Sequence, residues 1–425
     1  MKKAELLSPA GNFEKLKIAL AYGADAVYGG VSHFSLRIRS GKEFTYDTFH
    51  EAIDYTHEQG KKLYVTVNGF PFNNQLKMLG DHIRKVAAMK PDALIVSTPG
   101  VIKLAKDIAP DIPLHLSTQA NVLNYLDAEV FHEMGVERII AAREVGLKDL
   151  IEIKSHLPNL EIEIFVHGSM CFAYSGRCLI SSLQSGRVPN RGSCANDCRF
   201  DYTLYAENPD NGVLMKIEQD EAGTHIMNAK DMNMAAHVAE ILESGVIDSL
   251  KIEGRTKSPY YAAITARTYR QAIDDYYAQK FDAVKYEEEL LTTKHRGFTD
   301  AYLFQRPHER EDTQNLETAM SEGTYEVSGL VLEDGEHFMC KYKTYPNMPI
   351  ELILPLHAEV EPVESPLGKI YKKEGKWWIE FSKIVTNTDK ELESVHSGYT
   401  LPIKLPGRLP PFSIMRQRIA VPTEA

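Results

Sequence analysis

The sequence predicts an α/β fold: a TIM-like (β/α)8 barrel with a Cys-bearing insertion before its last strand, plus a small C-terminal antiparallel β domain. Short apolar runs alternate with amphipathic stretches over residues 1–284, and a polar stretch follows. In the remaining residues apolar and polar side chains alternate with a period of two. We therefore expect a barrel at 1–284, a linker or helical extension at 285–322, and a β-barrel-like domain at 323–425.

Seven apolar runs of strand length precede the cysteine-rich region. They are mostly apolar and do not alternate strictly, which is typical of parallel strands buried on both faces. The runs are 5–11, 26–30, 63–68, 93–97, 114–119, 138–144 and 162–168.

Helix signals lie between these runs. Asn12 is a candidate N-cap, and glycines stand where three helices should stop. An eighth strand at 249–255, followed by a helix at 260–278, completes eight alternations, which favour a barrel over a doubly wound sheet. The other predicted helices are 12–22, 46–59 and 124–134, and the glycines are Gly23, Gly60 and Gly135.

Two further regions complete the organisation. Residues 170–245 are too long for a simple loop, so we expect an elaborated insertion at the C-terminal mouth of the barrel, where such enzymes place their chemistry. The C-terminal strands are predicted at 327–332, 338–345, 350–356 and 377–384, with turns at 334–335 and 375–376.

Composition excludes several classes of protein. The chain has 425 residues, 43% of them hydrophobic, which is enough to bury a sizeable core and disfavours disorder. It contains no apolar run long enough to span a membrane and no signal peptide, so we expect a cytoplasmic protein with no membrane partner. The 48 basic and 59 acidic residues give a net charge of -11, which argues against nonspecific coating of nucleic acid.

Four of the five cysteines fall within 28 positions: Cys171, Cys178, Cys194 and Cys198. Disulfides are disfavoured because nothing indicates export. The C-x3-C pair suits structural zinc, but the C-x6-C pair is loose for it, and four thiolates on an irregular loop suit an iron–sulfur cluster. We expect a [4Fe-4S] cluster, with zinc as the alternative and Cys340 as a buried core thiol.

The cysteines stand in a locally basic segment. Between residues 167 and 200, four arginines against Asp197 give +3. Such a segment suits an anionic small molecule or the phosphates near one nucleotide, and arginines that balance the cluster's thiolates are the alternative. The arginines are Arg177, Arg187, Arg191 and Arg199.

Polar side chains also occupy the predicted strand ends. Lys251, Glu253 and Arg255 alternate onto one face, where charges bind ligand or form a structural ion network. His167 is a candidate acid–base or substrate-orienting group, or a structural histidine. Weaker candidates for the pocket are Asn68, Gln119 and Glu144.

The sequence around the first two cysteines resembles peptidase family U32, the collagenase-like proteins. The similarity is carried by Glu163-x-Phe165-x-x-Gly168-Ser169-Met170-Cys171 and by Gly176-x-Cys178-x-Ile180-Ser181. It extends through 116–119, 190–192, 194–198 and 248–255. The resemblance is greatest to the branch that hydroxylates the wobble uridine of tRNA, without oxygen and with prephenate.

This resemblance implies roles for individual residues. Cys171, Cys178, Cys194 and Cys198 would be the cluster ligands. His167 and Glu253 are the catalytic candidates from their positions at the strand ends. The partners would be tRNA, bound transiently, an anionic co-substrate (prephenate), and a second copy or another family member in an oligomer. The candidate substrate-binding residues are Gln119, Tyr174, Arg177, Arg191, Lys251 and Arg255.

Two other functions stay open at this point. The family name implies a collagenase-like peptidase, although the sequence contains neither H-E-x-x-H nor G-x-S-x-G. A cluster-bearing assembly or binding subunit without turnover of its own is the second alternative.

Overall fold

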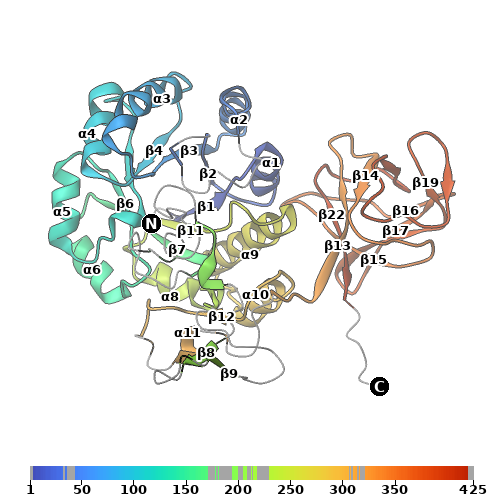
Figure 1. Ribbon diagram of the computed structural model, residues 1–425. Coiled ribbons are helices and arrows are strands. Elements are labelled where there is room, and N and C mark those ends of the chain that lie inside the picture. Colours follow the sequence, from blue (N-terminus) through green and yellow to red (C-terminus); the bar gives the residue numbers. More distant parts are fainter. Residues whose placement is uncertain are drawn as a thin grey trace.

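The structure is a computed structural model, and Figure 1 shows a helix-ringed barrel beside a β domain coloured orange to red. It describes residues 3–31, 34–35, 44–170, 178, 180, 194–199, 204–207, 212, 214–217, 229–305, 307, 310–313, 315 and 321–419.

Eight parallel strands of the described chain close into a barrel in the order β11-β1-β2-β3-β4-β5-β6-β7, and β7 pairs back onto β11. The predicted fold class is therefore confirmed. The strands are β1 (Glu5–Pro9), β2 (Ala26–Gly29), β3 (Lys62–Val67), β4 (Ala93–Val96), β5 (Leu114–Leu116), β6 (Arg138–Ile140), β7 (Glu161–Ser169) and β11 (Ser249–Ile252).

Helices cover the outside of this barrel. Their starts follow capping chemistry: the Asn12 side chain accepts a hydrogen bond from the Lys15 backbone, as predicted, and Ser258 caps α9 in the same way. The helices are α1 (Phe13–Ala21), α2 (Tyr46–Glu58), α3 (Leu76–Ala88), α4 (Pro99–Ile108), α5 (Tyr125–Glu133), α6 (Leu147–His156), α8 (Val238–Glu243) and α9 (Pro259–Tyr277).

The insertion between β7 and β11 extends the sheet beyond the barrel. β10 (Asp231–Asn233) pairs antiparallel with the last residues of β7, and β12 (Phe298–Thr299) pairs parallel with β10. β8 (Leu204–Glu207) and β9 (Leu214–Ile217) form a separate hairpin.

The polar stretch at 285–322 holds more structure than a plain linker. α10 (Ala283–Leu290) buries only Tyr286 and Leu290, which explains the weak apolar signal in its sequence. A short α11 (Arg310–Thr313) follows β12. The predicted domain bounds themselves stay a prediction.

The C-terminal domain is an antiparallel sheet in the order β16-β17-β18-β15-β22-β13-β14-β21, accompanied by the pair β19–β20. The β17–β18 turn consists of Glu374 and Gly375, both with positive φ, one residue earlier than predicted. The strands are β13 (Tyr325–Val331), β14 (His337–Cys340), β15 (Ile350–Ile353), β16 (Val363–Ser365), β17 (Gly368–Lys373), β18 (Lys376–Phe381), β19 (Ile384–Val385), β20 (Glu391–Leu392), β21 (Ile403–Lys404) and β22 (Ile414–Arg418).

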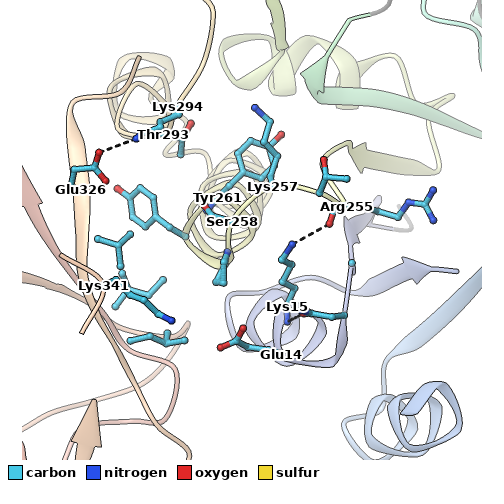
Figure 2. Close-up of a pocket in the computed structure, with 18 of the residues that line it drawn as sticks. Glu14, Lys15, Arg255, Lys257, Ser258, Tyr261, Thr293, Lys294, Glu326 and Lys341 are labelled. Carbon is cyan, nitrogen blue, oxygen red and sulfur yellow. Dashed lines mark hydrogen bonds and ion pairs between the residues drawn. The ribbon is translucent and has the colours of Figure 1, made fainter. Parts of the chain in front are cut away.

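The two domains are joined by buried contacts. Leu330, Ile353 and Ile414 of the β domain belong to the same apolar cluster as the barrel residues. The Tyr22 hydroxyl donates to the carbonyl oxygen of Ile353 at 2.8 Å. Beside this contact, a cleft of about 690 Å³ lies between the domains (Figure 2).

Arg416 of β22 is the main polar connection across the interface. Its guanidinium is 2% exposed and donates to Glu289 of α10 at 2.7 Å and to Glu351 of β15 at 3.1 Å. It also donates to the Tyr260 hydroxyl of α9 at 3.0 Å. One side chain therefore ties the β domain to two helices of the barrel domain.

None of the described helices combines the length and apolar character needed to cross a membrane.

Arg416→Ala is expected to lower the free energy of unfolding by about 1–3 kcal/mol, because the buried Glu351 carboxylate loses its arginine and keeps only the ion pair with Lys376. Urea denaturation followed by circular dichroism measures the change. Lys383→Ala, which removes an exposed pair with Glu391, is the matched control and should change stability by less than about 0.5 kcal/mol. Equal effects of the two substitutions would contradict this account of the interface.

Candidate active site at the barrel mouth

A buried arginine lies at the C-terminal end of the barrel. Arg255 follows β11, and its guanidinium donates to Ser35 Oγ at 2.7 Å and to Thr66 Oγ1 at 3.1 Å. The two hydroxyls are themselves 2.6 Å apart. The two hydroxyls therefore fix the position of the guanidinium at the mouth.

A second polar group forms the rim above β3, β4 and β5. Asn68 Nδ2 donates to Ser117 Oγ at 3.3 Å, and Ser97 Oγ donates to the Asn68 carbonyl oxygen at 2.9 Å. The Gln119 side-chain oxygen lies 3.4 Å from the same Ser97 Oγ. The structure therefore brings the predicted Asn68 and Gln119 together in one network.

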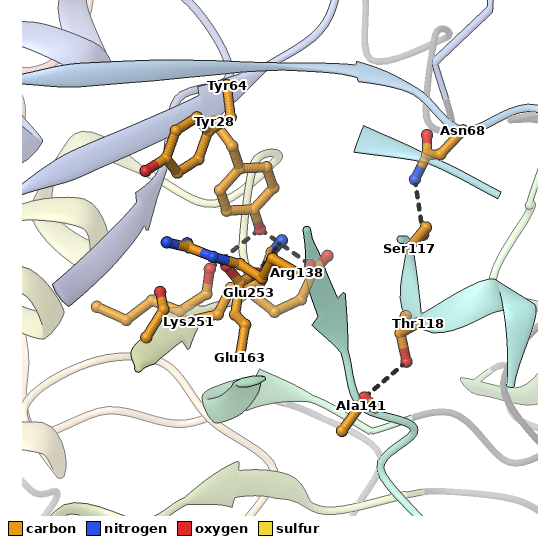
Figure 3. A network of polar contacts seen from close by, with 12 residues as sticks. Tyr28, Tyr64, Asn68, Ser117, Thr118, Arg138, Ala141, Glu163, Lys251 and Glu253 are labelled. Carbon is orange, nitrogen blue, oxygen red and sulfur yellow. Dashed lines mark hydrogen bonds and ion pairs between the residues drawn. The ribbon is translucent and has the colours of Figure 1, made fainter. Parts of the chain in front are cut away.

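Below the mouth, the barrel encloses charged side chains (Figure 3). Glu163 is fully buried and accepts from Lys251 Nζ at 2.7 Å and from Arg138 at 3.0 Å. Arg138 also binds Glu5 at 2.6 Å and Glu161 at 2.7 Å. Each buried charge has an opposite partner, as its removal from water requires.

Lys251, a predicted substrate-binding residue, lies within this network. Burial lowers the pKa of the Lys251 ammonium, and the neighbouring Glu163 carboxylate opposes that shift. Its Nζ also lies 4.3 Å from the centre of the Tyr28 ring. These contacts compensate the positive charge of Lys251 inside the barrel. Its role in substrate binding stays a prediction.

Glu253 faces the same interior. Its carboxylate accepts from the Tyr28 hydroxyl at 3.1 Å, and its backbone amide donates to the His167 carbonyl oxygen at 2.8 Å. Glu253 is 8% exposed, so it lies between the interior network and the mouth. This position suits a group that meets bound substrate, and its catalytic role stays a prediction.

His167 does not face the barrel interior. The β7–β11 register shifts between Phe165, paired with Lys251, and His167, paired with Ile252. This bulge turns His167 outward, where its ring lies against Tyr261 and Tyr269 of α9.

Burial lowers the pKa of His167 to about 3. The imidazole is therefore neutral near pH 7, and the Tyr269 hydroxyl lies 3.4 Å from its Nδ1. The environment is that of a histidine that fixes β7 against α9, and the predicted acid–base role stays a prediction.

The strand that leads to the cysteines makes a close contact with β11. Gly168 has φ +112°, and a Cβ there would lie 2.7 Å from the Glu253 carbonyl oxygen. The backbones of β7 and the β11–α9 loop therefore approach each other at a distance that only glycine permits.

The cysteine cluster lies partly outside the described residues. Cys171, Tyr174, Arg177 and Arg191 are among those outside. Cys178 and Cys198 are half-buried and Cys194 is exposed, whereas Cys340 is buried in the β domain as expected. Among the residues that the structure describes, no three His, Cys, Asp or Glu side chains converge to hold a metal ion. The metal centre stays a prediction.

Sequence reasoning missed the side chains that hold Arg255 and Glu163. Tyr64 and Thr66 of β3 alternate into the barrel, in step with the predicted Asn68 just after the strand, and contact Glu5 and Arg255, respectively. Their period of two was a usable signal, whereas nothing local indicated that Ser35 or Arg138 would join them.

Comparison with known proteins identifies the family of this barrel protein. The model of peptidase family U32 matches residues 11–313, which include nearly the whole barrel and the insertion. The chain belongs to peptidase family U32.

Three relatives show the range of names within this family. A protein of Helicobacter pylori (strain ATCC 700392 / 26695), called tRNA hydroxylation protein P, is 60% identical over 99% of this chain and 100% of its own length. The Escherichia coli (strain K12) protein of the same name is 42% identical, over 76% of this chain and 78% of its own. A Porphyromonas gingivalis (strain ATCC BAA-308 / W83) protein called collagenase is 30% identical, over 70% and 73%.

Gly168→Ala is expected to destabilise the protein by about 1–3 kcal/mol, because its φ and the nearby Glu253 oxygen leave no room for a methyl group. Gly100→Ala is the matched control, since Gly100 lies in α4 with open space around it and should gain about 0.5–1 kcal/mol. Thermal unfolding of both variants tests the contrast, and a neutral Gly168→Ala would contradict the close approach.

His167 is expected to make stability depend on pH. Its pKa is about 3 in the folded protein and 6.5 as an ordinary histidine, so the unfolded chain binds the extra proton between these values. The contribution of neutral His167 to the free energy of unfolding is complete above about pH 6.5 and is lost as the pH falls toward 3. The free energy of unfolding then changes by at most about 1.4 kcal/mol per pH unit. In urea titrations across this range, His167→Gln should give a shallower slope. An unchanged slope would show that His167 does not titrate in this way.

Proposed function

We propose that the chain is an iron–sulfur-dependent enzyme that hydroxylates the wobble uridine of tRNA, without oxygen and with prephenate as co-substrate. One observation carries the proposal: 60% identity over 99% of the chain to a protein named tRNA hydroxylation protein P. Such a function implies a cytoplasmic location. The homo- or hetero-oligomer expected from sequence stays a prediction.

The chemistry of the donor set fits a cluster. Cys171, Cys178, Cys194 and Cys198 would hold it, because four thiols are the usual ligands of a [4Fe-4S] centre, with zinc as the alternative. Cys171 follows the end of β7 by two residues, so the backbone contact at Gly168 would set where the first ligand begins. When bound, the cluster would supply redox chemistry or substrate activation.

The barrel mouth supplies the binding groups in this proposal. Arg255, held by Ser35 and Thr66, would bind a carboxylate of prephenate, since a guanidinium pairs with carboxylates through two parallel hydrogen bonds. Gln119, on the rim, would bind the base or the co-substrate. Tyr174, Arg177 and Arg191 are proposed for the same pocket from sequence alone.

A collagenase-like peptidase is the second candidate, because a relative 30% identical is named collagenase. The barrel-interior network gives it little support. Its charged groups are paired with one another, as Glu163 is with Lys251 and Arg138. A peptidase needs a nucleophile beside a base, or a metal-bound water. A cluster-bearing assembly subunit without turnover is the third.

Metal content and tRNA nucleosides test the proposal together. Anaerobically purified protein should be brown with about four iron atoms per chain, and Cys171→Ala should lose them. Cys340→Ala is the matched control, because Cys340 is buried in the β domain and should not affect iron. In a deletion strain, mass spectrometry should show loss of 5-hydroxyuridine derivatives, restored by wild type and Cys340→Ala but not by Cys171→Ala.

The alternatives predict different results. Stoichiometric zinc in a colourless protein would overturn the iron–sulfur centre. Iron with unchanged tRNA nucleosides would favour the assembly subunit. Gelatin cleavage that a single substitution abolishes, with normal tRNA, would favour the peptidase.

A further inference from the structure

The interdomain cleft lies beside the barrel mouth and adjoins it at Arg255, which is one of the residues that line the cleft. It is bounded by the β1–α1 turn, the loop after β11 and residues 293–294, and in the C-terminal domain by β13, by Lys341 after β14 and by Ile414 of β22. Its volume of about 690 Å³ exceeds what a few ordered water molecules would fill. The cleft is therefore large enough for a sizeable ligand.

The cleft carries an excess of positive charge. Four lysines line it against two glutamates, Glu14 and Glu326, for a net of +2 in a chain whose total charge is -11. This count leaves out Arg255, a lining residue whose guanidinium points toward the mouth. Lys294 forms an ion pair with Glu326 at 2.9 Å, in which the lysine side chain is 58% exposed. An exposed pair of this kind contributes little stability and can exchange partners. The four are Lys15, Lys257, Lys294 and Lys341.

Two helices add to this potential, because α1 and α9 both begin at the cleft. Their N-caps, Asn12 and Ser258, are lining residues. The N-terminus of a helix carries about half an elementary positive charge. The helix ends thus supplement the lysines.

The lysines come from four separate segments and are distributed around the cleft instead of converging on one point (Figure 2). A compact anion would contact one or two of them. A chain of phosphates could contact several in succession, and lysines act on phosphates as point charges that do not read sequence. The arrangement therefore fits an extended polyanion.

The cleft and the mouth share one loop. The Arg255 carbonyl oxygen accepts from Lys15 Nζ at 3.2 Å on the cleft side. The Arg255 guanidinium points away from the cleft in Figure 2 and binds Ser35 and Thr66. A strand held in the cleft would thus lie one loop away from the barrel mouth.

We infer that this cleft binds the phosphodiester backbone of the RNA substrate beside the nucleotide that enters the barrel. The inference rests on the proposed function and adds to it a binding surface that the β domain helps to form. It also explains how an acidic protein holds RNA: the positive charge is confined to one cleft.

Salt-dependent binding of a tRNA transcript, followed by fluorescence anisotropy, tests the cleft. The double variant Lys294→Gln/Lys341→Gln should lose about tenfold in affinity, and the slope of log K against log salt should fall by about 1.5. Lys103→Gln/Lys383→Gln is the matched control: it removes the same charge from two exposed lysines outside the cleft and should bind like wild type.

A gain of affinity gives a test that misfolding cannot imitate. Glu14 is exposed at the cleft in the first turn of α1, so Glu14→Gln removes a repulsive charge. It should tighten tRNA binding by about twofold to fourfold.

The outcomes separate this inference from the proposed function. If wild type binds tRNA but the cleft and control doubles have the same affinity and slope, the cleft inference is overturned and the function stands. The inference is likewise overturned if the cleft double keeps its tRNA affinity and loses only prephenate. If wild type neither binds tRNA nor alters its nucleosides, the proposed function fails first.

Discussion

The enclosed ion network of the barrel is the constraint on which the other features depend. Glu163 is fully buried, and it is tolerable there only because Lys251 and Arg138 both donate to it. These residues come from β7, β11 and β6, so the network can form only when the barrel closes in this register. Removing one partner would leave a buried charge uncompensated. The network thus specifies strand neighbours as well as filling the interior.

The residues of the barrel mouth are positioned by contacts with this ion network. Tyr28 lies against Lys251 and donates to Glu253, which connects the interior to the end of β11. The bulge in β7 lies beside Lys251 and Ile252 of β11 and turns His167 toward α9. Just after it, Gly168 lies against the Glu253 backbone. The same short segments therefore position the β11–α9 loop, the buried Arg255 and the start of the cysteine-bearing insertion.

The β domain forms one wall of the cleft that we propose as an RNA-binding site. Arg416 and the apolar contacts of Ile353 and Ile414 hold it against α9 and α10. Because these contacts are buried, the cleft between the domains has defined walls, and the backbone positions that carry its lysines are set by the packing of the two domains. Cysteine chemistry, carboxylate binding at Arg255 and backbone binding in the cleft would then lie on neighbouring parts of one surface.

The sequence by itself determined the features that local patterns encode. Apolar runs and caps such as Asn12 predicted the barrel, since strand burial and helix capping act over a few residues. The cysteine spacing is the basis of the hypothesis of a metal centre. Only the tertiary structure decided that Arg138 meets Glu5, 133 residues away, and that Arg255 meets Ser35, 220 residues away. It also decided that a one-residue bulge turns His167 out of the barrel. Such pairings depend on register and chain closure, which leave no local period in the sequence.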